Sequence, residues 1–362
     1  MIPVSQPHIG QKEKEYVADA VESGWVSSSG AYIGRFETAL QSYLDAPHVL
    51  STSNGTTALH LALLAIGVGP DDEVIIPASS FIATVNAVLY VGATPVFVDI
   101  EEHAWGIAPD RIEEKITKKT KAIIAVHLYG YGCHIAHVKE VADAHDLWLI
   151  EDNAESIGAT WQGTRLGTVG DIGIYSFYGN KIITTGEGGA VSTANGDLFE
   201  RMSILKNHGR KTNGEYIHEM CGYNYRMTNM QAALGCAQLE QIDDFLAARR
   251  HIEELYDGML GTFFTRQIEY PDTAHVMWLY SGLVPVNVGV DAVRVYLKER
   301  GVDTRPLFYP MNKMPYMDPS LRSEEYPMAT QLYTRGVTLP TFVGLTDRQI
   351  ETVCEHLQAV CK

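Results

Sequence analysis

Lys181 is the residue whose surroundings point most directly to chemistry. It stands in Ser176-Phe-Tyr-Gly-Asn-Lys-Ile-Ile-Thr-Thr-Gly-Glu-Gly-Gly189, among apolar and small residues and ahead of a glycine-rich turn. An ammonium group in such surroundings is poorly solvated, which favours its neutral, nucleophilic form. A phosphate-binding loop would need G-x-x-x-x-G-K-[ST], but Asn180 and Ile182 flank the lysine, so that pattern fails. A surface lysine on a bend stays open as the plain alternative.

Asp152 offers this lysine a chemical partner. It ends the strand-like run 147–152, and Lys181 comes soon after the strand-like run 171–176. A lysine that forms an imine and a carboxylate that keeps a pyridine nitrogen protonated are the two groups that pyridoxal phosphate (PLP) requires. The pair therefore favours a PLP site in which Lys181 and Asp152 are the catalytic residues.

Four further residues fit the phosphate and the ring of this cofactor. Gly55 and Thr56 lie between a strand candidate and a helical run, where free N–H groups at a helix N-terminus bind phosphate. Ser176 adds a hydroxyl, and Phe81 is expected to stack on the ring. Each residue alone has a plainer interpretation as a cap, a core residue or a strand residue. Their order along the chain favours the cofactor site.

Elements that would position these residues alternate along the chain. Near-continuous apolar strands separated by helices predict an α/β fold with a mainly parallel sheet covered on both faces. Asn54, Phe81, His127 and Asp152 all fall at or just after predicted strand ends. Ligands gather at the carboxyl ends of such strands. The expected strands are 48–52, 73–77, 94–99, 122–127, 147–152, 171–176 and 188–192.

A long amphipathic helix at about 230–259 is expected to connect two domains. Residues 1–240 would form the large domain and residues 241–362 a smaller α+β C-terminal domain. Within the smaller domain, 276–285 is strand-like, and three stretches are helical: 291–300, 328–335 and 346–360.

Composition narrows the classes of partner. The formal net charge of -16 argues against nucleic acid and against an anionic membrane, although local basic sites for a small anion are compatible with it. The chain shows no apolar signal core and no run of membrane-spanning length. The five cysteines are scattered and form no C-x-x-C pair, which predicts reduced thiols, a cytoplasmic protein and no metal site.

Four motifs give the chain a family resemblance. They are Asn54-Gly-Thr-Thr57, Glu151-Asp-Asn-Ala-Glu155, the lysine stretch 176–189, and Tyr223-Asn-Tyr-Arg-Met-Thr-Asn229. Together they resemble the PLP-dependent nucleotide-sugar aminotransferases of the DegT/StrS family, and the resemblance covers essentially the whole chain. It implies the fold-type I aminotransferase architecture and a homodimer with active sites at the interface.

The resemblance also assigns roles to individual residues. It implies that Lys181 bonds to PLP, Asp152 pairs with the pyridine nitrogen, and Phe81 stacks on the ring. Glu155 would lie near the phenolic oxygen of the cofactor. The phosphate site would comprise Gly55, Thr56 and Ser176, joined by Asn224 from the neighbouring subunit. Some relatives have histidine at the lysine position and are dehydratases, so the lysine here favours amino transfer.

The substrate side rests on a narrower resemblance. Gly24-Trp-Val-Ser-Ser, the glycine-rich end of the lysine stretch and Thr304-Arg-Pro-Leu-Phe-Tyr-Pro310 are most similar to the subgroup that aminates GDP-4-keto-6-deoxymannose to GDP-perosamine, with glutamate as donor. This implies a role in the O-antigen of lipopolysaccharide. A UDP- or dTDP-linked ketohexose as substrate, or a non-catalytic PLP-binding regulatory protein, stays open. Candidates for substrate contact are Trp25, Ser27, His208, Arg226, Arg305 and Tyr309. For the two arginines a structural salt bridge is an equal alternative.

Overall fold

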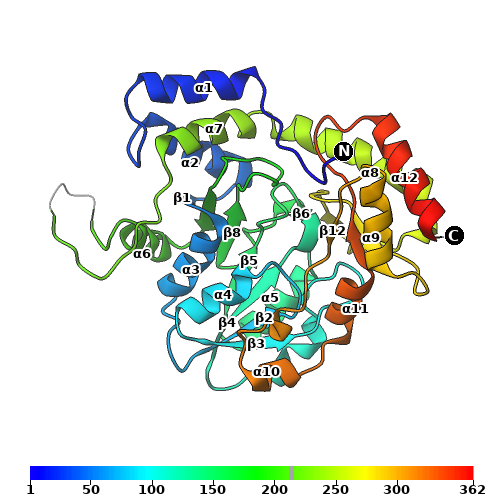
Figure 1. Cartoon of the computed structure of the whole chain (residues 1–362). Helices are drawn as coiled ribbons and strands as arrows, with labels where there is room; N and C mark the ends of the chain where they lie inside the picture. The colour runs from blue at the N-terminus through cyan, green and yellow to red at the C-terminus, as the bar shows by residue number, and fades with distance from the viewer. Residues whose placement is uncertain (212–215, 362) are drawn as a thin grey trace.

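The computed structural model describes residues 1–211 and 216–361 and is built around a seven-stranded sheet (Figure 1). The strand order is β1-β9-β8-β5-β4-β2-β3. Only β9 runs antiparallel to its neighbours in this sheet; the pairs from β8 to β3 are parallel, which confirms the predicted sheet. The strands are β1 (His48–Thr52), β2 (Glu73–Pro77), β3 (Thr94–Val98), β4 (Thr120–Val126), β5 (Trp148–Asp152), β8 (Ile172–Ser176) and β9 (Gly189–Thr193).

Central strands are buried because helices cover both faces of the sheet. In β4 every residue except Lys121 is buried, and β5 is buried from Leu149 to Asp152. Such strands read as continuous apolar runs instead of alternating ones, which is why their positions could be predicted closely. The carboxyl ends of β5 and β8 lie side by side, because Asp152 pairs with Ile174 two residues before Ser176.

Two groups of helices flank the sheet. Helices α1 (Gln11–Glu22) and α2 (Ala31–Leu44) both pack on α7 (Asn229–Leu239), and Figure 1 shows these three together at the top. Helix α3 (Gly55–Ala65) packs on β8 and β9 beside α4 (Ala83–Tyr90) and α6 (Gly196–Lys206), and α5 (Ile135–Ala144) packs on β4 and β5. The sequence interpretation contained no helix at α2, although its buried Tyr32, Phe36, Leu40 and Leu44 recur every fourth residue.

The single helix expected at about 230–259 is wrong in detail, because two helices occupy this stretch. Helix α7 ends at Leu239 and α8 (Ile242–Leu260) begins three residues later. Gln241 has non-helical torsions (φ −119°, ψ 8°), and its side-chain amide donates to Glu13 and to the carbonyl of Ala237. The hydrogen bond to Glu13 ties the junction to α1, which favours a bend over a continuous helix.

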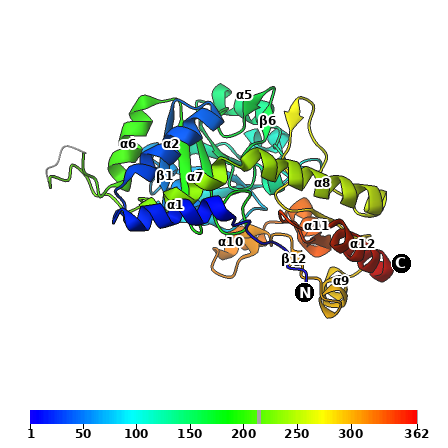
Figure 2. The same ribbon diagram turned by 90° about the horizontal axis from the view of Figure 1, so that it is seen from above.

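The C-terminal part forms a second cluster of buried residues. Apolar side chains of α8, α9 (Val290–Glu299) and α12 (Asp347–Cys361) pack together, and Figure 2 shows these helices beyond the end of α7. The strand expected at 276–285 shrinks to β11 (Ser281–Leu283), because the amides of Val276 and Trp278 instead pair with the loop carbonyls of Gly130 and Tyr129. β11 forms a small sheet with β13 (Gly336–Thr338) and β12 (Arg305–Pro306).

Short elements complete the arrangement. Helices α10 (Pro319–Ser323) and α11 (Pro327–Arg335) return the chain to the β3 edge of the large sheet. There Tyr326 and Leu332 pack into the hydrophobic core around that sheet. A third sheet pairs β10 (Thr273–Ala274) with β6 (Thr160–Trp161), which pairs with β7 (Thr164–Arg165). The N-terminus reaches the C-terminal part, since Ile2 forms a β-bridge with Val302. The domain boundary at residues 240 and 241 stays a prediction.

Candidate active site

Lys181 lies at the carboxyl edge of the sheet with its amine enclosed. Nζ is 3.6 Å from Oε1 of Glu155 and 3.8 Å from the centroid of the Trp278 ring. The side chain is 11% exposed, so the surface-lysine alternative does not hold. Burial lowers the pKa of the amine, and the neighbouring carboxylates of Glu155 and Asp152 oppose that shift. The amine is therefore more nucleophilic at neutral pH than an exposed lysine.

Glu155 is a buried carboxyl group on the turn after β5. Its Oε2 accepts a hydrogen bond of 2.8 Å from the amide of Tyr129, while Oε1 faces Lys181. Burial raises the pKa of Glu155 to about 7, against the opposing effects of Lys181 and the Tyr129 amide. At neutral pH this side chain can therefore exchange a proton, which a freely solvated glutamate does not do.

Asp152 is buried at the end of β5, with hydrogen bonds on both carboxyl oxygens. Oδ2 accepts 3.1 Å from the Thr84 hydroxyl, and Oδ1 accepts 3.1 Å from the Ala154 amide. Burial raises the pKa of Asp152. Within 1–211 and 216–361, no cation forms an ion pair with it. A buried carboxyl group without an ion-pair partner suits a protonated ring nitrogen, because that positive charge would lie directly against it.

Gly55 and Ser176 come together although they lie far apart along the chain. A Cβ at Gly55 would lie 2.9 Å from Cβ of Ser176, so only glycine allows this approach of helix to strand. Asn54 caps α3 by accepting from the Thr57 amide at 2.9 Å. The cap leaves the amides of Gly55 and Thr56 available to an anion at the helix N-terminus beside the Ser176 hydroxyl.

Phe81 lies two residues before α4 and three before the Thr84 that bonds to Asp152. Its ring is 55% exposed, and its edge faces Phe308 at 6.0 Å. Phe308 stacks on Tyr129, and Tyr129 stacks on Trp278. An aromatic wall of Phe81, Phe308, Tyr129 and Trp278 thus borders the lysine. The position of Phe81 is compatible with stacking on a ring held by Asp152.

Three contact residues were missed by the sequence interpretation. Thr84 lies inside a helix, and Tyr129 and Trp278 come from loops far from Lys181 in the chain. Tyr129 adopts a positive φ of 55°, which turns its amide toward Glu155. The one available signal was the position of Tyr129 just after a strand that ends at the ligand-binding edge; Trp278 had none.

A third buried acidic residue, Glu151, anchors the loop that follows the site. It accepts hydrogen bonds from the amides of Gly167, Val169 and Gly170, and one of 3.1 Å from Nε2 of His127. The Cys133 amide donates to Nδ1 of His127, which leaves the ring proton on Nε2 facing Glu151. His127 therefore links the end of β4 to Glu151 on β5 and has a structural role; it does not face Lys181.

Arg226 lies in a polar cluster on the loop before α7. Nε donates to Oδ1 of Asn224 at 2.9 Å, one terminal nitrogen donates to Asn207 at 3.1 Å, and the other contacts His208 at 3.2 Å. Among the described residues no carboxylate pairs with this guanidinium. Asn224 contacts none of the Lys181 site within the chain; its predicted place in the phosphate site of a neighbouring subunit stays a prediction.

The remaining candidates divide into exposed and paired residues. Trp25 is 58% exposed, and the carbonyls of Trp25 and Ser27 accept hydrogen bonds from the side chain and the amide of Asn229, which fixes their turn on α7. Arg305 forms a 2.7 Å ion pair with Asp303, which is the structural alternative left open for it. Tyr309 packs edge-on against Tyr333. In the single chain, none of the four contacts Lys181.

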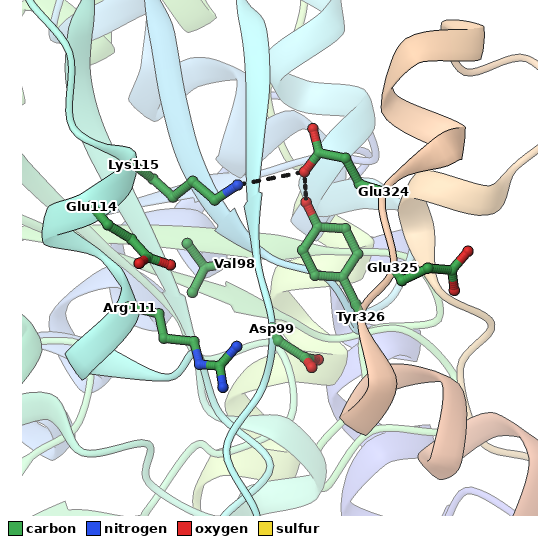
Figure 3. A pocket seen from close by; sticks show the side chains of 8 residues that line it. All are labelled: Val98, Asp99, Arg111, Glu114, Lys115, Glu324, Glu325 and Tyr326. Carbon is green, nitrogen blue, oxygen red and sulfur yellow. Dashed lines mark hydrogen bonds and ion pairs between the residues drawn. The ribbon is translucent and has the colours of Figure 1, made fainter.

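A separate crevice of about 270 Å³ lies at the β3 edge of the sheet (Figure 3). Glu324 accepts hydrogen bonds there from Lys115 and Tyr326. The crevice is lined by four carboxylates and two cations: Asp99, Glu114, Glu324, Glu325, Arg111 and Lys115. This excess of negative charge does not favour an anionic substrate.

No described helix is long and apolar enough to cross a membrane. The described residues also contain no group of His, Cys, Asp and Glu suited to a metal ion.

The cradle at Gly55 and Ser176, the buried Asp152 without an ion-pair partner among the described residues, and the enclosed Lys181 amine fit the phosphate, the ring nitrogen and the aldehyde of PLP. Fold and site together define a PLP-dependent aminotransferase. Residues 7–358 match the pattern of the DegT/DnrJ/EryC1/StrS aminotransferase family. The chain belongs to that family.

Similar proteins span the same length. GDP-perosamine synthase from Escherichia coli O157:H7 is 43% identical over 98% of this chain and 97% of its own. The Vibrio cholerae protein of the same name is 40% identical over 99% and 98%. Among solved structures, the putative sugar aminotransferase Spr1654 from Streptococcus pneumoniae in its PMP form superposes with a TM-score of 0.93 at 28% identity, over 99% of this chain and 97% of that one.

Proposed function

We propose that this protein transfers the amino group of L-glutamate to the C4 keto group of GDP-4-keto-6-deoxymannose, giving GDP-perosamine for the O-antigen of lipopolysaccharide. The choice of nucleotide and sugar is supported by two relatives that carry the name GDP-perosamine synthase at 43% and 40% identity. The observation that carries amino transfer is the enclosed Lys181 amine beside Glu155, with the buried carboxyl group of Asp152 at the neighbouring strand end.

Lys181 has two tasks in this proposal. When bound, PLP supplies an aldehyde that condenses with amines and a ring that accepts the electron pair left when a C–H bond breaks. Lys181 Nζ would hold the cofactor in the resting protein. Once released, Nζ would take the proton from Cα of glutamate, and in the second half of the reaction it would deliver a proton to C4 of the sugar side.

Asp152 and Glu155 divide the electrostatic work. Asp152 would keep the ring nitrogen protonated, and the Thr84 hydroxyl and Ala154 amide hold its carboxyl group in place. Glu155, with a pKa of about 7, would lie near the phenolic oxygen of the cofactor and could exchange a proton with Lys181. Phe81 would cover one ring face, while Gly55, Thr56 and Ser176 hold the phosphate.

The nucleotide diphosphate needs local positive charge on a chain that is acidic overall. We assign that role to Arg226 with His208, because the guanidinium bonds to the neutral side chains of Asn207 and Asn224 and so keeps its net charge for a ligand. Trp25, Ser27 and Tyr309 are weaker candidates for contact with the sugar or base. Arg305 is weaker than Arg226, because Asp303 neutralises it.

We further propose a homodimer in the cytoplasm, with Asn224 completing the phosphate site of the neighbouring subunit. Exposed aromatic side chains support an interface: Trp25 is 58% and Tyr216 87% exposed. Light scattering of the purified protein would report its mass in solution. A monomer with full activity would contradict the shared site.

A substrate panel tests the proposed reaction. The PLP-loaded protein is given glutamate with GDP-, UDP- and dTDP-linked 4-ketohexoses and a 3-ketohexose, and products are identified by mass spectrometry. We expect amination of the GDP-linked 4-keto-6-deoxymannose with stoichiometric release of 2-oxoglutarate. Amination of only a UDP- or dTDP-linked sugar would move the assignment to that nucleotide. Absence of 2-oxoglutarate with every sugar would favour a non-catalytic regulatory protein.

A further inference from the structure

Trp278 contacts both the side chain and the backbone of the lysine stretch. The Lys181 amine lies 3.8 Å from the centroid of the indole ring, and the indole Nε1–H donates a 2.7 Å hydrogen bond to the carbonyl of Asn180, the residue before the lysine. Trp278 is almost fully buried. It arrives from the segment after α8, so no local pattern in the lysine stretch encodes this contact.

Trp278 and Glu155 are held by the same residue. The Trp278 amide donates to the carbonyl of Tyr129 at 3.2 Å, and the two rings stack at 6.0 Å with an interplanar angle of 14°. The amide of Tyr129 donates to Glu155. Lys181, Trp278, Tyr129 and Glu155 thus form a closed ring of contacts in which the amine lies between an indole ring and a carboxyl group.

Arg249 on α8 fixes Trp278 from behind. It is 3% exposed, and one terminal nitrogen donates a 2.5 Å hydrogen bond to the carbonyl of Trp278. Within the described part of the chain no carboxylate pairs with this guanidinium, and burial lowers its pKa to about 10. A buried cation without a counter-ion is costly, and among the described residues the one hydrogen bond of its side chain goes to Trp278.

We propose that Trp278 is a positioning residue that defines where the Lys181 amine rests whenever that amine is not bonded to the cofactor. This rests on the proposed amino transfer, in which the same amine must be released, carry a proton and return. The face of an indole attracts an ammonium group, so the ring would hold the protonated amine in one place, opposite the Glu155 carboxyl group. Glu155 and Asp152 are the titratable groups near this amine, and the uncharged ring of Trp278 packs against it as a third neighbour.

The test measures the protonation of Lys181 directly. The full-length protein is converted to its pyridoxamine phosphate form, in which Lys181 is free, and is pulse-labelled with acetic anhydride between pH 6 and pH 11. Peptide mass spectrometry then gives the midpoint for acetylation of Lys181. We compare Trp278→Leu, which removes the aromatic face, with Trp278→Phe, which keeps a face but loses the bond to Asn180. Trp148→Leu, at the opposite end of β5 from Asp152, is the matched control.

Loss of the aromatic face should lower the labelling midpoint by about one pH unit in Trp278→Leu, because the ammonium form loses its attraction to the ring. Trp278→Phe should recover at least half of that shift, and Trp148→Leu should not move it. The rate of the glutamate half-reaction should fall about 10-fold in Trp278→Leu with little change in KM. An unchanged midpoint in a folded Trp278→Leu protein, or equal shifts for Leu and Phe, would overturn the proposal. The midpoint needs no ketosugar, so it stands apart from the substrate panel.

Discussion

The amine of Lys181 and Oε1 of Glu155 face each other across 3.6 Å, with the two side chains 11% and 5% exposed. Burial lowers the pKa of the first and raises the pKa of the second, so both groups titrate closer to neutrality than in water. An acid and a base whose pKa values converge can pass a proton in either direction. Lys181 needs such a partner in the proposed amino transfer, because its amine must take up a proton in each half of the reaction and give it up again.

Replacing Lys181 with alanine should reduce turnover by at least about 1,000-fold while pyridoxamine phosphate still binds, since its phosphate and ring contacts come from other residues. Release of 2-oxoglutarate and cofactor absorbance measure the two effects. Lys139→Ala, in an exposed pair with Asp143, is the control and should match the wild type. Full activity of Lys181→Ala would refute the assignment of the catalytic lysine.

Asp152→Asn should reduce kcat by roughly 100-fold or more, because an amide cannot keep the ring nitrogen protonated. Thr84→Val removes one of the two hydrogen bonds to Asp152, together with a bond to Ser80, and should cost about 10-fold. Steady-state kinetics of both variants establish the order of the effects. If Thr84→Val proved as damaging as Asp152→Asn, Thr84 would have to act on the cofactor and not through the aspartate.

Gly55→Ala should weaken cofactor binding by at least about 10-fold, because its Cβ would lie 2.9 Å from Cβ of Ser176 and push apart the two halves of the phosphate cradle. Titration with PLP measures this. Gly69→Ala meets no atom within 4 Å and is the matched control, with unchanged affinity. Undiminished affinity in Gly55→Ala would place the phosphate elsewhere.

Glu155 should make the cofactor-free protein less stable as pH rises. Its folded pKa of about 7 lies above its ordinary value of 4.5, so its contribution is complete below pH 4.5 and is lost as pH rises through 7. Urea unfolding from pH 5 to pH 8 should show the wild type losing up to about 3 kcal/mol relative to Glu155→Gln. Lys181, whose pKa is lowered, acts with the opposite sign.

For that reason the comparison is repeated in a Lys181→Met background, which removes the opposing amine. The difference in slope between the protein that retains Glu155 and the Glu155→Gln variant should persist there. Parallel pH profiles in both backgrounds would contradict the raised pKa of Glu155.

Much of the sheet could be predicted because its strands are buried on both faces. The runs ending at Thr52, Pro77 and Asp152 were placed within a residue, since continuous apolar runs bounded by helices have few other interpretations. The same logic brought Asp152, Gly55 and Ser176 to one edge. Helix α2 was missed although its apolar residues recur every fourth position, and the α7–α8 bend was missed because its junction is tied to a side chain of the distant helix α1.

The residues that hold the site residues in place were harder to predict than the site residues themselves. Thr84, Tyr129 and Trp278 reach Asp152, Glu155 and Lys181 through tertiary contacts that leave no mark on local spacing. Arg305 shows the converse: a basic residue in a suggestive motif pairs with Asp303 two positions earlier. Sequence patterns locate strand ends well, but which side chains turn toward a ligand depends on packing between distant segments.

The antiparallel strand β9 has a consequence for how the protein is made. Gly189 on β9 pairs with Thr52 on one side and Ser176 on the other, and a Cβ there would lie 2.6 Å from the carbonyl of Asn54. The two halves of the phosphate cradle therefore adjoin a strand that the ribosome delivers after both of them. The cradle is therefore complete only once β9 has inserted between its older neighbours, because β9 hydrogen-bonds to both β1 and β8.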